Sequence, residues 1–445
     1  MILTFIYPAV GKKKNKKYIH SWKMQPLPIM TVAALTPPDV EVKFFDDRLE
    51  LIDYDHKTDL VAINIEAYSA RRAYDIAKKF QDRNIPVVFG GYHATLMPKE
   101  AKQYGTSVVI GEAEDVWNNV IHDAKNHTLK PYYKSSARPR FGNVIPRTDI
   151  LEGKKYTDIT LIETSRGCKF SCNFCSIKSF FNSTYNFRTT QSVVNEIKIR
   201  KSKTIFFVDD NIISDVKRAK ELFRALIPLK IKWISQFSIN MAGDDELLKL
   251  MKKSGCMGVL IGFESLNPDN LKLMGKSWNQ TTDYSVPLKK LRDNGLCIYA
   301  TFVFGYDNDN EDSIKKTLDF ALENNFFFAA FNHLQPFPGT GYYEKLEQNK
   351  QIIYENWWLD PTYTYGKIVF RPDSVTPKAL ELKCIEARSK FYSPLSIIKR
   401  GLDLKTNSSS LPLALIFWGQ NFLAQKEVRS KWELPLGQNL DTAYK

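Results

Sequence analysis

The stretch SRGCKFSCNFCSIKS, residues 165–179, contains half of the six cysteines of the chain: Cys168, Cys172 and Cys175. In a chain of 445 residues, such a C-x₃-C-x₂-C cluster favours metal ligation over a disulfide framework. A closed zinc site needs four ligands, whereas clustered thiolates suit iron–sulfur clusters. A [4Fe–4S] cluster held by three cysteines leaves one iron without a protein ligand. The spacing therefore predicts an open iron that can bind another molecule.

The cysteine cluster directly follows the first strand in a series of βα units. Apolar runs separated by amphipathic helix patterns predict strands at 157–164, 203–210, 232–239, 256–265, 297–306 and 327–336. Six units predict a partial (β/α)6 TIM barrel, in which chemistry gathers at the carboxyl ends of the strands. Cys256 and Cys297 begin their strands, at the opposite end. A fourth ligand from one of these two or from Cys384 is the alternative that stays open.

The residues before this series predict a separate α/β domain. Strand patterns at 2–8, 40–47, 59–67, 85–91 and 107–114 alternate with helix patterns at 26–36 and 70–84. This order is typical of a doubly wound parallel sheet, which binds ligands at the carboxyl ends of its strands. We therefore expect a sheet domain at 1–125, a linker at 126–156, the barrel at 157–370 and a helical C-terminal region at 371–445.

The C-x₃-C-x-aromatic-C array after the first barrel strand resembles the radical S-adenosylmethionine superfamily. The resemblance implies that Cys168, Cys172 and Cys175 are the catalytic cluster ligands, and that S-adenosylmethionine chelates the open iron through its amino and carboxylate groups. One-electron reduction then yields methionine and a 5′-deoxyadenosyl radical. Phe174 is expected near the adenine, with ordinary loop packing as its alternative.

Polar residues at other strand ends fit the same resemblance. Asp209 and Asp210 follow the second strand, Gln236 lies in the third, and Glu264 ends the fourth. We expect these side chains to contact the ribose or the methionine part of S-adenosylmethionine. For Glu264 the alternative is a salt bridge near the barrel rim.

The amino-terminal sheet resembles the Rossmann-like domain of the cobalamin-binding subclass. The segments that carry this resemblance are DLVAINIEAYSARRAYDIAKKF (59–80), IPVVFGGYHATLMPKEA (85–101) and VVIGEAE (108–114). It implies that the carboxyl edge of the sheet holds the lower face of cobalamin, where glycines let the backbone approach a flat macrocycle. The matching loop residues are Glu66, Ala67, Tyr68, Gly90, Gly91, His93, Gly111 and Glu112.

One feature of the cobalt-coordinating proteins is missing from the sequence. None of the six histidines has an aspartate two residues before it, so the motif D-x-H-x-x-G does not occur. We therefore expect no histidine ligand to cobalt, and His93 to pack or hydrogen-bond near the corrin instead. A sheet domain that persists as a scaffold without corrinoid stays open as an alternative.

The function that follows from this resemblance is radical methylation of an unactivated carbon. The substrate is expected to be a small molecule or a lipid of isoprenoid type, and flavodoxin or ferredoxin the electron donor. The alternative is a cyclase- or epimerase-type radical enzyme, with or without cobalamin. Counting the S-adenosylmethionine consumed and the methyl groups gained would separate the two outcomes.

The charge of the chain leaves a third class of function to consider. The net charge is +14, and GKKKNKK (11–17) adds five lysines within seven residues. Nucleic acid or tRNA is one partner for such a surface, an anionic lipid is another, and a solvated loop is the alternative to both. No cysteine precedes Cys168, which argues against the tRNA-methylthiolating relatives, since these carry an extra cysteine-bearing domain.

The sequence shows no segment that would take the chain into or across a membrane. The start, MILTFIYPAV, is followed by lysines and not by a cleavage site, and the apolar run 411–418 is too short to span a bilayer. We expect a cytoplasmic protein in which at most a peripheral membrane contact occurs.

Overall fold

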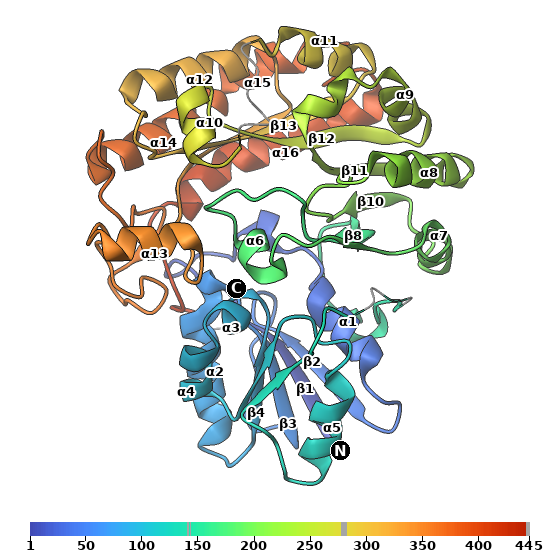
Figure 1. The fold of residues 1–445 in the computed structure, drawn as a ribbon, viewed down its shortest axis with the longest axis vertical. Coiled ribbons are helices and arrows are strands. Elements are labelled where there is room, and N and C mark those ends of the chain that lie inside the picture. The colour runs from blue at the N-terminus through green and yellow to red at the C-terminus, as the bar shows by residue number, and fades with distance from the viewer. Residues whose placement is uncertain (140–141, 143, 277–282, 442–445) are drawn as a thin grey trace.

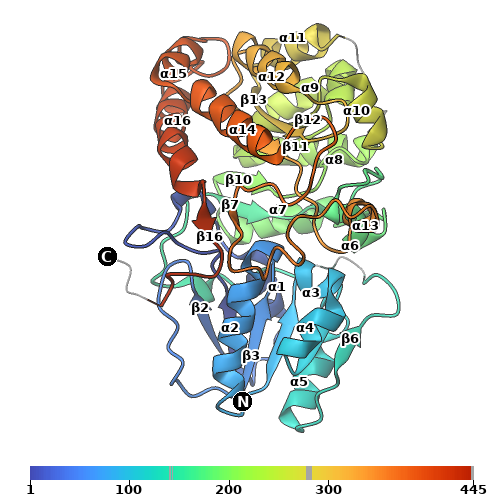
Figure 2. The same cartoon turned by 90° about the vertical axis from the view of Figure 1, so that its left-hand side faces the viewer.

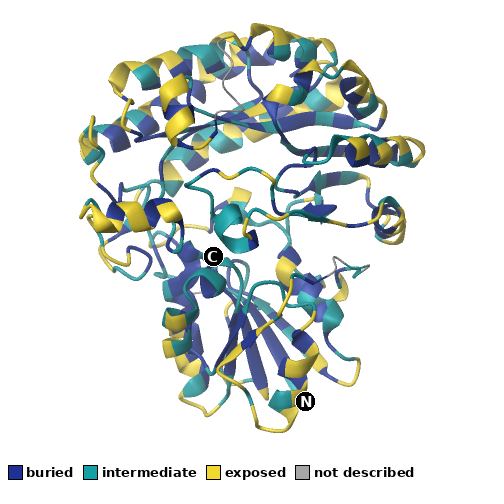
Figure 3. Cartoon of the chain, viewed as in Figure 1, coloured by how far each residue is buried: buried dark blue, intermediate teal, exposed yellow. Residues whose placement is uncertain are grey.

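The computed structural model of the chain describes residues 1–139, 142, 144–276 and 283–441. Two parallel α/β sheets lie one above the other, with the amino-terminal sheet below and the barrel sheet above in Figure 1. The strands of both sheets are largely buried, as the dark blue ribbons in Figure 3 show. The predicted fold class, a parallel α/β sheet followed by a partial barrel and a helical C-terminal region, is confirmed.

The amino-terminal sheet has six parallel strands in the order β2-β1-β3-β4-β5-β6. Its central strand β3 has four consecutive apolar residues followed by Asn64, and all five are buried, because helices cover both faces of a parallel sheet. The strands are β1 (Ile2–Tyr7), β2 (Glu41–Asp46), β3 (Leu60–Asn64), β4 (Val87–Gly90), β5 (Ser107–Ile110) and β6 (Tyr132–Lys134). The helices are α1 (Leu27–Leu35), α2 (Ala70–Gln81), α3 (Tyr92–Leu96), α4 (Pro98–Tyr104) and α5 (Trp117–Lys125).

The edge strand β6 falls in the segment 126–156, which we expected to be a linker. It pairs in parallel with β5, from Val108–Tyr132 to Ile110–Lys134, and so extends the amino-terminal sheet. With three residues and only Tyr133 buried, it is too short to give a periodic pattern in the sequence. Part of the predicted linker therefore belongs to the sheet.

The barrel sheet also has six parallel strands, in the order β14-β13-β12-β11-β10-β7. The six predicted strands are all present: β7 (Thr160–Ile162), β10 (Thr204–Phe207), β11 (Lys232–Phe237), β12 (Cys256–Glu264), β13 (Cys297–Phe304) and β14 (Phe328–His333). The helices that accompany them are α7 (Thr190–Ile199), α8 (Val216–Leu226), α9 (Asp245–Lys253), α10 (Pro268–Leu273), α11 (Ser285–Asp293) and α12 (Glu311–Glu323). The sheet is open between β7 and β14, as a partial barrel requires.

Local sequence signals start several of these barrel helices. The side chains of Thr189, Asp215, Asp244 and Asn310 each accept a hydrogen bond from a backbone N–H group in the first turn of the following helix. Such N-caps satisfy backbone donors that the helix itself leaves unpaired. They fix where each helix begins, and with it the length of the loop at the carboxyl end of the preceding strand.

The segment after β7 carries the cysteine cluster toward the amino-terminal domain. A two-residue antiparallel pair, β8 (Ser165–Arg166) with β9 (Asn186–Phe187), closes a loop that contains the three cysteines and α6 (Ser176–Phe181). Figure 1 shows α6 between the two sheets. The loop therefore lies where the two domains face each other.

The rest of the chain is mostly helical, as expected, and returns to the domain boundary. It comprises α13 (Gly341–Gln348), β15 (Thr364–Tyr365), α14 (Pro377–Phe391), α15 (Pro394–Gly401), α16 (Leu411–Lys431) and β16 (Leu434–Pro435). Strands β15 and β16 pair in antiparallel fashion. Figure 2 shows α16 running along the outer edge of the molecule from α15 down to β16. No described helix is long and apolar enough to cross a membrane.

Candidate active site

A cavity of about 710 Å³ lies between the two sheets. Its size is that of a small-molecule site. The amino-terminal sheet lines it with strand ends and loops at its carboxyl edge, and the barrel lines it with the start of the cysteine loop. The first group includes Asn64, Glu66, Tyr68, Gly90, Gly91, Gly111 and Glu112, and the second includes Glu163, Ser165, Arg166, Val208 and Asp210. The carboxyl ends of both sheets therefore face one shared space.

The start of the cysteine loop is held by the two aspartates that follow β10. The carboxylate of Asp209 is wholly buried and accepts hydrogen bonds from the backbone nitrogens of Thr164 at 2.6 Å and Ser165 at 2.8 Å. Asp210 accepts one from the backbone nitrogen of Gly167 at 2.8 Å. Asp209 thus fixes the loop and has no oxygen directed into the cavity, so the predicted contact with S-adenosylmethionine is not supported for it. Asp210 does line the cavity.

Gly167, directly before the first cysteine, is a position that only glycine can occupy. Its φ is +84°, and a Cβ there would lie 2.1 Å from the carbonyl oxygen of Thr184. Side chains other than glycine are strained at this φ, and no side chain fits against a backbone atom at this distance. The close approach closes the loop at its base, so that the three cysteines are presented together.

The three cysteines have free thiols near one another. Cys172 is buried, and Cys168 and Cys175 are half-buried. Burial raises the pKa of each thiol, and that of Cys172 reaches about 11, with smaller contributions from the charges of Cys175 and Cys168. A bound cation would reverse this effect, because it favours the thiolate form.

Three free cysteines in one loop are a donor set that suits an iron–sulfur cluster. Among the described residues, no group of three or more histidine, cysteine or acidic side chains is placed to hold a metal ion. An iron–sulfur cluster takes each cysteine on a different iron, which spreads the thiolates more widely than one ion does. Cys256, Cys297 and Cys384 are buried in β12, β13 and α14, away from the loop. The residues present therefore fit a three-cysteine [4Fe–4S] site with an open iron.

Glu264 ends β12 beside the cysteine loop in a left-handed conformation, with φ of +61°. Its Oε1 lies 2.8 Å from the Nζ of Lys276, which also donates to the carbonyl oxygen of Gly262 at 2.7 Å. Both charges act on Cys172: Lys276 lowers the pKa of the thiol and Glu264 raises it. The salt bridge is the alternative given for Glu264, and its contact with S-adenosylmethionine stays a prediction.

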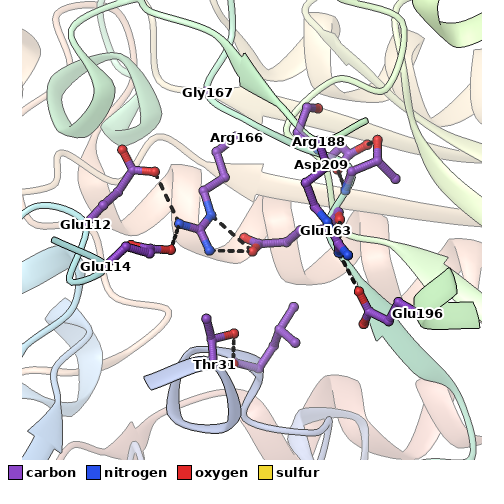
Figure 4. Close-up of polar contacts among 12 residues, drawn as sticks. Thr31, Glu112, Glu114, Glu163, Arg166, Gly167, Arg188, Glu196 and Asp209 are labelled. Atoms are coloured by element: carbon purple, nitrogen blue, oxygen red, sulfur yellow. Dashed lines mark hydrogen bonds and ion pairs between the residues drawn. The ribbon is translucent and has the colours of Figure 1, made fainter. Parts of the chain in front are cut away.

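Arg166 joins the cysteine loop to the amino-terminal domain. Its guanidinium contacts three carboxylates, Glu112 at 3.2 Å, Glu163 at 2.9 Å, and Glu114, which converge on it in Figure 4. Burial alone would lower the pKa of Arg166, but the carboxylates raise it well above its ordinary value. Arg138 adds a second cation, with its Nε 2.6 Å from Glu112. We call these five residues the arginine bridge.

Two more charged residues, Arg188 and Glu196, stabilise the start of the same loop. Arg188 donates to the carbonyl oxygen of Glu163 at 3.1 Å and forms a buried ion pair with Glu196 (Figure 4). The side chain of the same glutamate, Glu163, contacts Arg166. The ion pair is thus a support for the arginine bridge, and both of its side chains are at most 4% exposed.

The floor of the cavity is built from the predicted loops of the amino-terminal sheet. A Cβ at Gly90 or Gly111 would meet no atom within 4 Å, so at both positions the backbone is open toward the cavity. Gly91, by contrast, has φ of +99° and no room for a Cβ. Burial raises the pKa of Glu66, in the same floor, to about 7. These exposed backbone positions are a cradle that fits a flat macrocycle.

His93 is turned away from this floor. Its side chain is buried, its Nε2 lies 2.9 Å from Glu100, and its ring packs edge-on against Trp358. All six histidines are among the described residues, and none lines the cavity. His93 therefore does not line the cavity, and its packing or hydrogen bonding near a corrin stays a prediction.

Four further predicted residues remain, and only one of them, Tyr68, lines the cavity. Ala67 is buried in the turn after β3, and Tyr68 lines the cavity and packs against Trp357 and Tyr365. Phe174 is partly buried, with its ring 6.4 Å from that of Tyr306. Gln236 is half-buried in β11, and its carbonyl oxygen accepts a hydrogen bond from Ile212. Cofactor contacts of Phe174 and Gln236 stay predictions.

The comparisons with known proteins agree with this geometry. The sequence profile of the radical SAM superfamily matches residues 162–321, which include the cysteine cluster. The bacteriochlorophyllide d C-12(1)-methyltransferase of Chlorobaculum tepidum is 31% identical over 417 residues, which is 91% of this chain and 89% of the relative. The chain belongs to the radical S-adenosylmethionine superfamily. It is an enzyme of the subclass with an amino-terminal cobalamin-binding-type domain, as the sequence predicted.

Two more relatives cover most of the chain. The bacteriochlorophyllide d C-8(2)-methyltransferase of Chlorobaculum tepidum is 28% identical over 391 residues, 83% of this radical SAM enzyme and 86% of the relative. The solved structure of the methyltransferase TsrM from Kitasatospora setae, with cobalamin and a [4Fe–4S] cluster bound, has a TM-score of 0.64 at 14% identity, and covers 96% of this chain and 99% of that one. The likeness to TsrM extends over both domains of the fold.

Proposed function

We propose that this radical SAM enzyme methylates an unactivated carbon of a small, largely apolar molecule, with a [4Fe–4S] cluster, S-adenosylmethionine and cobalamin as cofactors. The observation that carries the proposal is the shared cavity: the cysteine loop and the open floor of the amino-terminal sheet face the same space. Two relatives that cover most of the chain are named as methyltransferases of a tetrapyrrole. The floor without a histidine fits a corrinoid whose lower face has no protein ligand.

Different residues of the chain would hold the cluster and the corrinoid. Cys168, Cys172 and Cys175 would hold the cluster, and the backbone at Gly90 and Gly111 would lie under the corrin. When bound, S-adenosylmethionine at the cluster would supply the adenosyl radical, and the corrinoid would supply the methyl group. The substrate would lie between the two, since residues at both ends of the cysteine loop, although none of its three cysteines, line the same cavity as the floor. Proximity would then decide which hydrogen is removed.

The walls of the cavity favour an apolar substrate that carries a few polar groups. Apolar side chains from α1 and α6 line it, among them Leu27, Val32, Phe180 and Phe181. Polar groups line it at the arginine bridge, between the two domains, and at Asn64 and Glu66 in the floor. Such a wall with a few convergent polar groups is typical of small-molecule sites. Bacteriochlorophyllide d and isoprenoid lipids are the first substrates to test, with flavodoxin or ferredoxin as the proposed electron donor.

The experiment that tests the proposal is an anaerobic assay of the reconstituted enzyme with cobalamin and labelled S-adenosylmethionine. Methylation requires two S-adenosylmethionine molecules for each methyl group gained: one yields 5′-deoxyadenosine and methionine, the other yields S-adenosylhomocysteine. The substrate loses one hydrogen atom and gains one methyl group. Consumption of one S-adenosylmethionine without methyl gain would replace the proposal by the cyclase- or epimerase-type reaction.

A further inference from the structure

The outer faces of α15 and α16 carry an apolar surface that the described part of the chain leaves uncovered. We call it the C-terminal apolar face and define it by Leu395, Ile398, Leu402, Leu404, Leu411 and Leu415. Four of these leucines, at 395, 402, 404 and 411, are 70–78% exposed. Single exposed leucines need no explanation, but five exposed leucines and one exposed isoleucine within 21 residues are typical of an interaction site.

The packing of the two helices explains why these leucines point outward. The ring of Trp418 lies where a Cβ on Gly401 would be, so the helices meet closely at this pair. On the inner side, the guanidinium of Arg400 donates to Phe326 O at 2.9 Å, and Ile397 and Phe417 are fully buried. Residues 395, 398 and 402 follow helical spacing on the opposite side of α15. Figure 2 shows both helices along one outer edge of the molecule.

Cations accompany the apolar face. Lys399 lies beside it on α15, and Lys426 and Arg429 follow on the next turns of α16; all three are exposed. The lysine loop of residues 11–17 joins them at the lower end of α16, where Lys13 Nζ donates to the carbonyl oxygen of Arg429 at 3.1 Å. The lysine-rich segment noted in the sequence thus extends the positive charge of the same edge.

Carboxylates do not balance these cations. Between residues 393 and 431 the sequence has only two acidic residues, Asp403 and Glu427. Asp403 pairs with Arg292 and Glu427 with Lys431, and both carboxylates are at most 7% exposed. Lys405, in the turn after α15, forms an ion pair with Asp293, which lies in α11. The edge is therefore apolar and positively charged.

We propose that the C-terminal apolar face is a peripheral docking site for an anionic lipid bilayer. Exposed leucines with lysines beside them insert into the membrane interface, and each lysine near an anionic surface adds to the attraction. A second copy of this chain fits less well, because an isologous contact would bring the unbalanced cations of both copies together. The docking site is independent of the cofactors and goes beyond the proposed function.

The test is flotation of the full-length protein with vesicles. The wild-type protein should float with vesicles of phosphatidylcholine and phosphatidylglycerol in equal parts, and not with phosphatidylcholine alone. The double variant Leu411→Glu with Leu415→Glu should lower the bound fraction at least about tenfold, because it places two charges in the acyl boundary. The matched control is Ile199→Glu on α7, a residue 62% exposed outside the apolar face, which should bind as the wild type does.

A second variant tests the charge separately. Lys426→Glu with Arg429→Glu should weaken binding to the anionic vesicles and make it less dependent on salt. The proposal is overturned if the wild type does not bind anionic vesicles, or if Ile199→Glu lowers binding as much as the leucine variant. A wild-type dimer that the leucine variant dissociates, without vesicle binding, would show a contact between copies instead. Deoxyadenosine formation should be unchanged in every variant, which separates this test from that of the proposed function.

Discussion

The guanidinium of Arg166 lies 3.2 Å from the carboxylate of Glu112. Arg166 is two residues before the first cluster cysteine, and Glu112 belongs to the floor of the other domain, so this contact connects the two. Glu112 follows Gly111, whose backbone is open to the cavity. The arginine bridge thus connects the loop that would hold the cluster to the loop that would lie under the corrin. A radical formed on one side and a methyl donor on the other require this distance to be fixed.

The first prediction concerns Arg166. The variant Arg166→Met should lose about 3–5 kcal/mol of unfolding free energy, because Glu114 and Glu163 are then left without their cation in a largely buried place. Glu112 keeps its contact with Arg138. Its cluster content should fall as well, since the cysteine loop loses its anchor. Thermal unfolding and iron analysis of the reconstituted protein measure the two effects.

An exposed ion pair gives the matched control for Arg166. Arg147 pairs with Asp149, and the two side chains are 36% and 59% exposed. Arg147→Met should therefore cost less than about 1 kcal/mol and leave the iron content unchanged. Equal losses in the two variants would mean that the arginine bridge does not connect the domains.

The second prediction concerns the pH dependence of stability through Glu66. Burial raises the pKa of this carboxyl from 4.5 to about 7. A carboxyl with a higher pKa in the folded state binds its proton more tightly there, so the unfolding free energy should fall as the pH rises from 4.5 to about 7. Glu66→Gln removes this contribution and should be more stable than the wild type by about 1–3 kcal/mol above neutral pH, but not at low pH.

The comparison for Glu66 is a glutamate at the exposed edge of the same sheet. The side chain of Glu41 in β2 is 61% exposed. Glu41→Gln should change the unfolding free energy by less than about 0.5 kcal/mol at either pH. Chemical denaturation at low pH and above neutral pH measures the unfolding free energy of the wild type, Glu66→Gln and Glu41→Gln. A Glu66→Gln variant whose advantage does not grow with pH would refute the prediction.

The third prediction tests the cluster ligands. Cys172→Ala should abolish both cluster binding and deoxyadenosine formation, because the remaining two thiols of the loop cannot hold three irons. Cys384→Ala removes a thiol that is buried in α14, outside the cysteine loop, and should retain iron while losing about 0.5–3 kcal/mol of stability. Anaerobic absorption spectra with iron analysis compare the two. A Cys172→Ala protein that makes deoxyadenosine at the wild-type rate would contradict the assignment.

The sequence predicted the strands and the cysteine cluster because their signals are local. An apolar run such as β3 and a C-x₃-C-x₂-C spacing need only neighbouring residues to be recognised. It could not decide between Asp209 and Asp210. The two follow the same strand, but the first is wholly buried against the loop and the second lines the cavity. Adjacent residues of extended backbone point in opposite directions, and the sequence does not show which direction faces the ligand.

The sequence also could not predict which side chains from distant segments contact the site residues. Lys276 reaches Glu264 from twelve residues away, and nothing in the sequence marks Lys276 as the partner of that glutamate. His93 was expected at the corrin because it follows the glycines of β4, but its helix directs the ring toward Glu100. Arg166 lies two residues before the first cysteine, and two of its carboxylate partners come from the other domain. In each case the partner lies on an element whose position depends on the complete fold.

The last prediction separates two adjacent glycines in the floor of the cavity. Gly90→Leu should fold normally, because a Cβ at Gly90 meets no atom within 4 Å. Its side chain should enter the cavity and weaken the binding of hydroxocobalamin at least about tenfold, which corresponds to about 1.4 kcal/mol. Gly91→Ala should instead destabilise the fold, by about 1–3 kcal/mol, since its φ is +99° and its Cβ would lie 2.7 Å from Asn64 Oδ1.

Iron content and corrinoid affinity together decide how the glycine variants are interpreted. Gly90→Leu should keep the iron of the wild type while it loses corrinoid, because the cysteine loop belongs to the other domain. The control is Gly243→Leu, an exposed glycine of the barrel that also has no atom within 4 Å of a Cβ, and it should keep both. If Gly90→Leu binds hydroxocobalamin as tightly as the wild type, the carboxyl edge of the amino-terminal sheet is not the corrinoid floor, and methyl transfer from that side of the cavity is excluded.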